Sequence, residues 1–171
     1  MLNVRSTERR SRLASPIAPP MAPIEKLPPQ NVEAEQSCLG SLLIDKDAIF
    51  KVADFLHPED FYKEIHSLIY DCMLDLFNRR EPIDLLSLST RLADKSKLEL
   101  VGGRAYLSSL SNMVPTSSHV VHYGNIVQRK STLRRLIMSA GHIASLGYEE
   151  SEDLEKVLDQ AEQSLFDVSQ R

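Results

Sequence analysis

Apolar residues return every three or four positions along most of this chain, and short stretches rich in proline, glycine and charged residues interrupt them. That spacing is typical of an α-helix that buries one face. No run of alternating β-branched residues favours a strand. The pattern therefore predicts an all-α fold. We expect a globular helical bundle over residues 29–117, followed by a C-terminal helical hairpin over residues 118–171.

The start of the chain lacks this periodicity. Prolines crowd residues 15–30 (SPIAPPMAPIEKLPPQ), where they fix φ and remove backbone donors. Such a stretch has no apolar face whose burial could offset the entropy lost on ordering. We therefore expect residues 1–28 to form a disordered Pro/Arg-rich arm. A transit peptide is the alternative for the Arg-rich beginning, but Glu8 and the prolines argue against it.

The first helix is predicted over residues 32–44. Asn31 is a favoured N-cap, and Glu33 and Glu35 fall in the first turn, where the helix dipole stabilises anions. The apolar stripe of this helix consists of Val32, Cys38, Leu39, Leu42 and Leu43.

Two more helices are predicted before residue 80. Asp45 is placed to cap the first of them, and Pro58 ends it because the residue before a proline avoids the helical conformation. After a turn that presents Phe61 and Tyr62, a longer helix over residues 63–79 is the candidate for the central core helix. Its apolar positions are Ile65, Leu68, Ile69, Cys72, Met73, Leu76 and Phe77.

The remaining bundle consists of two short helices. Asp84 caps the first, and Pro115 ends the second. Gly102 and Gly103 separate them and favour a turn that needs positive φ. The residues expected to point inward are Leu85, Leu88 and Leu92 in the first helix and Ala105, Leu107 and Leu110 in the second.

Two long amphipathic segments occupy the chain from residue 118 onward, with only LGYEES between them. Short connections join antiparallel neighbours, so these segments predict a hairpin. Gly147 falls at the expected end of its first helix, and Ser151 is the expected N-cap of the second, with Glu152 and Asp153 in the first turn. Each Leu or Ile left in water forgoes roughly 1.5–3 kcal/mol. The hairpin therefore favours a further partner, unless it folds back on the bundle.

Charge and cysteine content limit the partners and the cellular setting expected for this chain. The net charge of −4 gives the chain no overall basic field that would attract nucleic acid. A local patch, QRKSTLRR, carries Arg129, Lys130, Arg134 and Arg135, which could touch a phosphate backbone or form a solvated helix face. Cys38 and Cys72 are not in a CxxC pair, and no apolar run approaches the roughly 20 residues that cross a bilayer. A reducing, cytoplasmic setting without membrane contact is expected.

The sequence offers no candidate catalytic, cofactor-binding or metal-binding residues. It contains neither the phosphate-binding GxxxxGK[ST] nor GxGxxG. His119 and His122 could share a helix face, but no nearby cysteine or HExxH arrangement completes a metal shell. We therefore predict that this chain alone is not an enzyme.

Five stretches, in order, resemble the N-terminal domain of bacterial replicative DNA helicases of the DnaB family. They are PPQNVEAEQSCLGSLL, DFYKEIHSLIYDCMLDL, EPIDLLSLSTRL, LELVGGRAYLSSLSNMVPTS and HYGNIVQRKSTLRRLI. The resemblance runs from about Pro28 to the C-terminus. It implies a helical bundle and hairpin whose neighbouring copies pair, as dimers within a hexameric collar. ATP and Mg²⁺ are implied only for a separate C-terminal ATPase domain, whose P-loop is absent here.

The same resemblance implies docking of a DnaG-type primase and, in some members, of a helicase loader, with DNA contacted only indirectly. The residues expected to contact a primase are Tyr106, Ile137 and Ile143, with packing of Tyr106 in the bundle core as the alternative. The residues expected at protein interfaces are Tyr106, Leu133, Leu136, Ile137, Ala140, Ile143, Leu154, Leu158, Ala161 and Leu165.

Two other functions fit parts of the sequence. The helicase-interacting domain of a primase has a similar helical shape, but the PPQNVEAEQ opening argues against it. A small nucleic-acid-binding helical protein would use the basic patch, yet no aromatic residues interleave with its charges to stack on bases.

Overall fold

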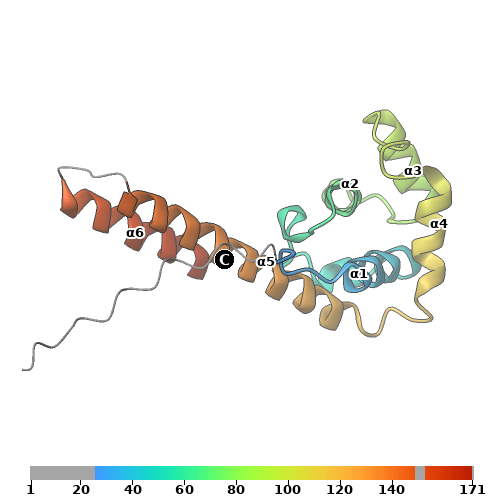
Figure 1. The fold of residues 1–171 in the computed structure, drawn as a ribbon. Coiled ribbons are helices and arrows are strands. Elements are labelled where there is room, and N and C mark those ends of the chain that lie inside the picture. The colour runs from blue at the N-terminus through green and yellow to red at the C-terminus, as the bar shows by residue number, and fades with distance from the viewer. Residues whose placement is uncertain (1–25, 149–152, 171) are drawn as a thin grey trace, which may run out of the picture.

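A computed structural model describes residues 26–148 and 153–170, which contain six α-helices, two short 3₁₀ helices and no strand (Figure 1). The predicted all-α fold is confirmed. Most of the predicted arm lies outside the described residues. The elements are α1 (Val32–Ile44), η1 (Ala48–Lys51), η2 (Pro58–Asp60), α2 (Glu64–Asn78), α3 (Leu85–Asp94), α4 (Gly103–Met113), α5 (Val120–Tyr148) and α6 (Leu154–Ser169).

Helix α1 has the predicted bounds, and the side chain of Asn31 accepts a hydrogen bond from the amide of Ala34 at 2.9 Å. It packs against α2, α4 and α5, so α1 takes the central place that the sequence had suggested for α2. Gly40 permits its close approach to α4, because a Cβ there would lie 2.2 Å from the carbonyl oxygen of Leu110.

The segment after α1 differs from the prediction. The second helix expected there is a 3₁₀ turn, η1, followed by hydrogen-bonded turns up to residue 55. Ile49, Val52 and Leu56 are nonetheless buried. Only residues 45–57 lie between α1 and Pro58, and tight turns bring these three side chains into the core without a regular helix.

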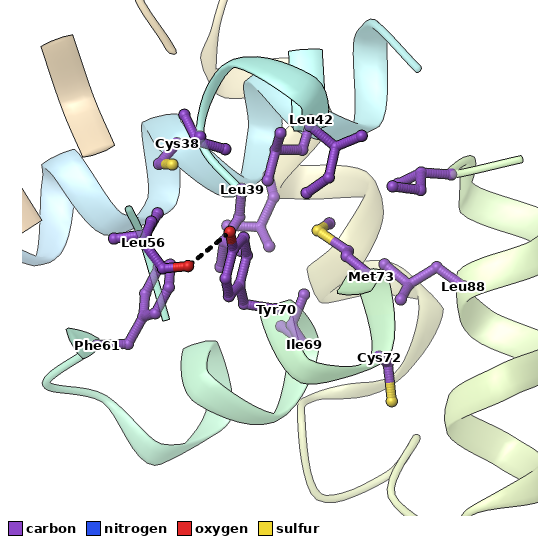
Figure 2. Packing of buried hydrophobic residues seen from close by; sticks show 14 of the residues in the cluster. Cys38, Leu39, Leu42, Leu56, Phe61, Ile69, Tyr70, Cys72, Met73 and Leu88 are labelled. Atoms are coloured by element: carbon purple, nitrogen blue, oxygen red, sulfur yellow. Dashed lines mark hydrogen bonds between the residues drawn. The ribbon is translucent and has the colours of Figure 1, made fainter. Parts of the chain in front are cut away.

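The core of the bundle lies between α1, α2 and the turns (Figure 2). Tyr70 on α2 is fully buried, and its hydroxyl donates to the carbonyl of Leu56 at 3.1 Å. Leu39, Ile69 and Met73 surround it without exposed surface. Burial raises the pKa of the Tyr70 hydroxyl, so the side chain stays neutral and its one hydrogen bond satisfies it.

Helices α3 and α4 complete the bundle. Asp84 caps α3 by accepting from the amide of Ser87 at 2.8 Å, as predicted. Leu88 and Leu92 are buried. Leu85 was expected inside, but it is the first residue of α3 and its side chain is 37% exposed to solvent. Gly102 and Gly103 have φ of 95° and 67°, which confirms the predicted left-handed turn. Ala105, also expected inside, is exposed at the start of α4.

Helix α5 is 29 residues long and leaves the bundle halfway along its length (Figure 1). Val120, Gly124, Val127 and Ser131 are buried against the bundle, and α6 packs against the part of α5 that leaves the bundle (Figure 1). Gly147 lies within α5 and does not end it. Asp153, rather than Ser151, caps α6 by accepting from the amide of Lys156 at 3.3 Å, while Ser151 and Glu152 lie outside the described residues.

Candidate protein interface

The projecting half of α5 and α6 form a hairpin with much exposed apolar surface. Helix α6 has no buried residue. Its half-buried positions, at residues 153, 157, 161, 164 and 168, repeat every three or four residues and mark the face that packs on α5. Leucines beside that face remain in solvent. The larger exposed side chains are Leu133 (38%), Leu136 (44%), Ile137 (58%), Met138 (66%), Leu154 (67%), Leu158 (54%), Leu165 (51%) and Phe166 (55%).

Nine of the ten predicted interface residues lie on this hairpin, but they do not all behave alike. Ile143 and Ala161 are half-buried, and the two helices that carry them pack against each other. Ala140 is exposed, as are the leucines and Ile137. The structure therefore divides the predicted stripe into a seam inside the hairpin and an uncovered face beside it.

Tyr106 does not join this group. It lies on α4, and α1 packs between α4 and α5 (Figure 1). Its half-buried ring is held through its hydroxyl, which lies 2.6 Å from Nε2 of His66 and accepts from the Gln36 amide at 3.2 Å. These contacts of Tyr106 are with other residues of the bundle, as the alternative of packing in the bundle expects.

Glu35 is the centre of the network that holds Tyr106. Its carboxylate is 2% exposed and lies 2.6 Å from Nδ1 of His66, which is fully buried. It also accepts from the backbone amides of Tyr62 at 2.6 Å and Lys63 at 3.3 Å. Because a carboxylate only accepts, Nδ1 of His66 carries the proton. The carboxylate therefore joins α1 to the turn at residues 62–63 and to α2, and His66 extends the network to Tyr106 on α4.

Arg134 fastens the hairpin to the bundle. Its guanidinium donates to the carbonyl of Pro29 at 2.8 Å and to that of Asp60 at 2.6 Å. It also lies over the ring of Tyr62, 5.6 Å from the centroid. Burial lowers the pKa of Arg134 because it disfavours the charged form. The nearby carboxylates of Glu35 and Asp60 act against this shift because they favour the charged guanidinium.

An apolar hollow of about 520 Å³ opens at this base. Tyr62, Ile137 and Met138 form its walls together with Leu27, Pro28 and Pro29. Lys26 and Arg134 are its only charged lining residues in the described part of the chain, and both are cations. The hollow therefore suits an apolar or aromatic side chain that approaches with negative charge.

The basic patch read from the sequence is divided by the fold. Arg134 is committed to the bundle, and Arg135 donates to the hydroxyl of Thr132 at 3.1 Å, while Nε and Nη1 of Arg135 are buried without a hydrogen-bond partner. Only Arg129 and Lys130 remain as candidates for an external phosphate. This arrangement weakens the nucleic-acid-binding alternative, which needed four cations on one face.

Groups that could do chemistry are few in the described residues. No cluster of three or more His, Cys, Asp or Glu side chains could hold a metal ion there. Cys38 and Cys72 are free and buried, and desolvation raises the pKa of Cys38 to about 12. A thiol with that pKa is not a nucleophile near neutral pH. No helix within residues 26–148 and 153–170 is long and apolar enough to cross a membrane.

Sequence reasoning missed the network around Glu35. It treated Glu33 and Glu35 alike, as first-turn anions, although only Glu35 is buried. A signal was present, because Glu35 stands three residues after Val32 and three before Cys38, within the apolar stripe of α1. The roles of His66 and Arg134 left no such local signal.

Comparison with known proteins agrees with this architecture. Residues 27–129 match the family described as DnaB-like helicase N terminal domain. The replicative DNA helicase DnaB of Geobacillus stearothermophilus is 43% identical over 147 residues, which cover 86% of this chain and 32% of the relative. DnaB of Mycobacterium leprae is 38% identical over 154 residues, which cover 89% and 26%. The chain thus spans about a quarter to a third of the length of these curated relatives.

Solved structures show the same fold. The crystal structure of the N-terminal domain of DnaB helicase from Mycobacterium tuberculosis has a TM-score of 0.79 and 39% identity, over 82% of this chain and 99% of that one. A DnaB-like replicative helicase, described with its interactions with primase, has a TM-score of 0.69 and 27% identity, over 81% of this chain and 32% of that one.

Proposed function

The chain belongs to the DnaB-like helicase N-terminal domain family, and from this premise we propose that it is the non-catalytic collar domain of a hexameric replicative DNA helicase. It acts in DNA replication, in the cytoplasm, through association of its subunits and docking of primase. Residues 29–117 form the globular part and residues 118–171 the pairing hairpin. ATP and Mg²⁺ would act in another domain of the helicase, since this chain carries no P-loop sequence.

One observation supports self-association more than any other. Leu136, Ile137, Leu158 and Leu165 stand in solvent on a hairpin that projects from the bundle. Fully burying such a side chain is worth roughly 1.5–3 kcal/mol, and because about half of each is already covered, the contact gains roughly half of that from each one. Both copies contribute, and this gain works against the cost of association. Copies of the same chain present the same apolar face, so a closed symmetric pair covers both at once.

The test replaces two exposed residues by aspartate. Ile137→Asp with Leu158→Asp puts carboxylates on the uncovered face, and neither side chain contributes to the bundle core. Ile143 is not chosen because it is half-buried against α6. We expect a folded monomer, since an unpaired charge in an apolar contact costs several kcal/mol. Light scattering gives the mass and circular dichroism the helix content.

The matched control is Leu86→Asp on α3, where a leucine is 67% exposed on the bundle. This variant should keep the mass of the unmodified chain. A monomeric unmodified chain at high micromolar concentration would contradict self-association, and so would a double variant that keeps the oligomer.

Primase docking is the second part of the proposal. The DnaB-like helicase noted above was described with its interactions with primase. Here Ile137 lines the apolar hollow, and the Tyr106 ring is half exposed on α4. We expect Ile137→Ala and Tyr106→Ala to weaken binding of a DnaG-type primase domain, measured by calorimetry. Tyr106→Phe keeps the ring and should keep binding. Equal loss in the Phe and Ala variants would assign Tyr106 to the internal network alone. A helicase loader is a further partner of the same collar.

A further inference from the structure

A second cavity, of about 610 Å³, opens on the bundle between η1 and the end of α2, and we call it the Phe50 cavity. Phe50 is 66% exposed, and its ring meets the ring of Phe77 edge to face, with centroids 4.9 Å apart. This contact fixes the Phe50 ring against the bundle and leaves much of it open to solvent. Tyr106 and the described hairpin residues do not line the cavity, so the proposed function does not use it.

The open apolar surface of the Phe50 cavity is made of rings. Its aliphatic lining residues, Ile49 and Ile83, are only 1% and 3% exposed and belong to the core. Phe50 and Pro82 are exposed, and Phe77 is half-buried. An aliphatic side chain from outside would therefore find little aliphatic surface to cover. A flat ring finds a stacking platform, and every nucleobase has such a face.

Each wall of the cavity carries one cation beside one anion. Lys46 and Asp47 stand before η1, and Arg80 and Glu81 follow α2. All four are exposed, and their side chains make no hydrogen bond or ion pair with another residue in the described part of the chain. A nucleotide offers a phosphate to the cations and base N–H groups to the carboxylates. Each kind of charged group thus has a counterpart in one ligand.

We propose that the Phe50 cavity binds single-stranded nucleic acid, with one base stacked on the Phe50 ring and the neighbouring phosphates beside Lys46 and Arg80. A strand suits the cavity better than a free nucleotide, because most lining residues are exposed and the chain of a strand can pass through an open site. Two cations beside two carboxylates are also too few to neutralise a diphosphate or triphosphate. This inference goes beyond the proposed function, in which DNA is contacted only indirectly.

Stacking rather than charge gives this site its affinity. The four charged lining residues sum to zero and the whole chain carries −4, so no long-range field draws a strand to the cavity. A base stacked on an aromatic side chain contributes about tenfold or more in affinity. A single chain therefore binds weakly, and several copies on one strand bind more tightly through their raised effective concentration.

Fluorescence anisotropy of a dye-labelled oligodeoxythymidylate tests the site. A strand of about 16 nucleotides is long enough for one binding module. At low salt we expect the unmodified chain to bind it at high micromolar concentration, and Phe50→Ala to weaken the binding about tenfold. Phe50→Tyr keeps the ring and should keep the affinity. The matched control is Leu100→Ala, which removes an apolar side chain that is 62% exposed elsewhere on the bundle.

Arg80→Gly separates binding from stability. Arg80 ends α2 with φ of 60°, and Ser96 follows α3 with φ of 55°, so both stand in the left-handed region that glycine prefers. We expect Arg80→Gly and its control Ser96→Gly both to keep or raise the melting temperature. Only Arg80→Gly should weaken binding. The slope of log affinity against log salt should become shallower by about 0.7, because one cation on a single strand is lost.

The outcomes are distinct from those of the proposed function. A flat titration with the unmodified chain overturns the inference, and so does unchanged affinity in Phe50→Ala or in Arg80→Gly. Equal loss in Phe50→Ala and Leu100→Ala would equally contradict it. Thymidine monophosphate that competes as well as the strand would identify a free nucleotide as the ligand and overturn the strand. Light scattering should give Phe50→Ala the mass of the unmodified chain, and a monomeric chain that still binds the strand would contradict the collar and support this site.

Discussion

Replacing Glu35 by glutamine is expected to destabilise the bundle far more than the same change two residues earlier. Glu35 and Glu33 are both in the first turn of α1 and lose the same charge in this substitution. Glu35, however, is 2% exposed and receives hydrogen bonds from two backbone amides and His66. Glu33 is exposed.

The magnitude follows from these contacts. Hydrogen bonds to a charged group contribute about 1.5–3 kcal/mol each, and a buried donor left unsatisfied costs about 1–3 kcal/mol. A glutamine amide has one oxygen where the carboxylate has two, so its NH₂ group must face one of the three donors. We therefore expect Glu35→Gln to lower the free energy of unfolding by about 2–4 kcal/mol. Glu33→Gln should cost no more than about 0.3–1 kcal/mol, the usual value for a first-turn anion.

Urea unfolding followed by circular dichroism gives the free energy of unfolding of both variants. If this free energy falls with urea concentration at the same slope in both, the variants differ in stability alone. A double-mutant cycle with His66→Phe adds the coupling between the two side chains, expected at about 0.5–3 kcal/mol. If Glu35→Gln and Glu33→Gln lower the free energy of unfolding by the same amount, the hydrogen bonds to Glu35 do not stabilise the packing of the helices.

Three further predictions concern other parts of the chain. Asp75 accepts from Arg91 at 2.6 Å, which holds its pKa well below the usual value. Because this contribution is complete above the unfolded pKa of about 4 and is lost as pH falls, Asp75→Asn and the unmodified chain should differ by about 1 kcal/mol at pH 7 and converge at lower pH in urea titrations. Gly40→Ala should cost more than about 3 kcal/mol by thermal unfolding, since the carbonyl of Leu110 blocks a Cβ, whereas Gly141→Ala meets open space and should stabilise α5 by about 0.5–1 kcal/mol. The purified chain should release no phosphate from ATP above a buffer blank. ATP hydrolysis that persists through further purification would contradict its assignment as non-catalytic.

Features that depend on neighbours in sequence could be predicted correctly. The caps at Asn31 and Asp84, the left-handed pair Gly102–Gly103 and the bounds of α1 all follow from interactions within a few residues. Helical periodicity likewise predicted the apolar hairpin, because residues three and four apart share a face wherever the helix lies. The same local logic failed at Gly147 and Ser151, where several residues could each end or begin a helix.

Tertiary structure alone decided which polar groups are used inside the protein. Glu35 meets His66 from 31 residues away, and Arg134 reaches Pro29 across 105 residues. Only the packing of α1 against α2, α4 and α5 brings these groups within hydrogen-bond distance. The same packing turned Tyr106 toward His66 and left Ile137 outside. A side chain's neighbours in sequence set its helix face, and the fold determines whether that face meets a donor, an apolar core or solvent.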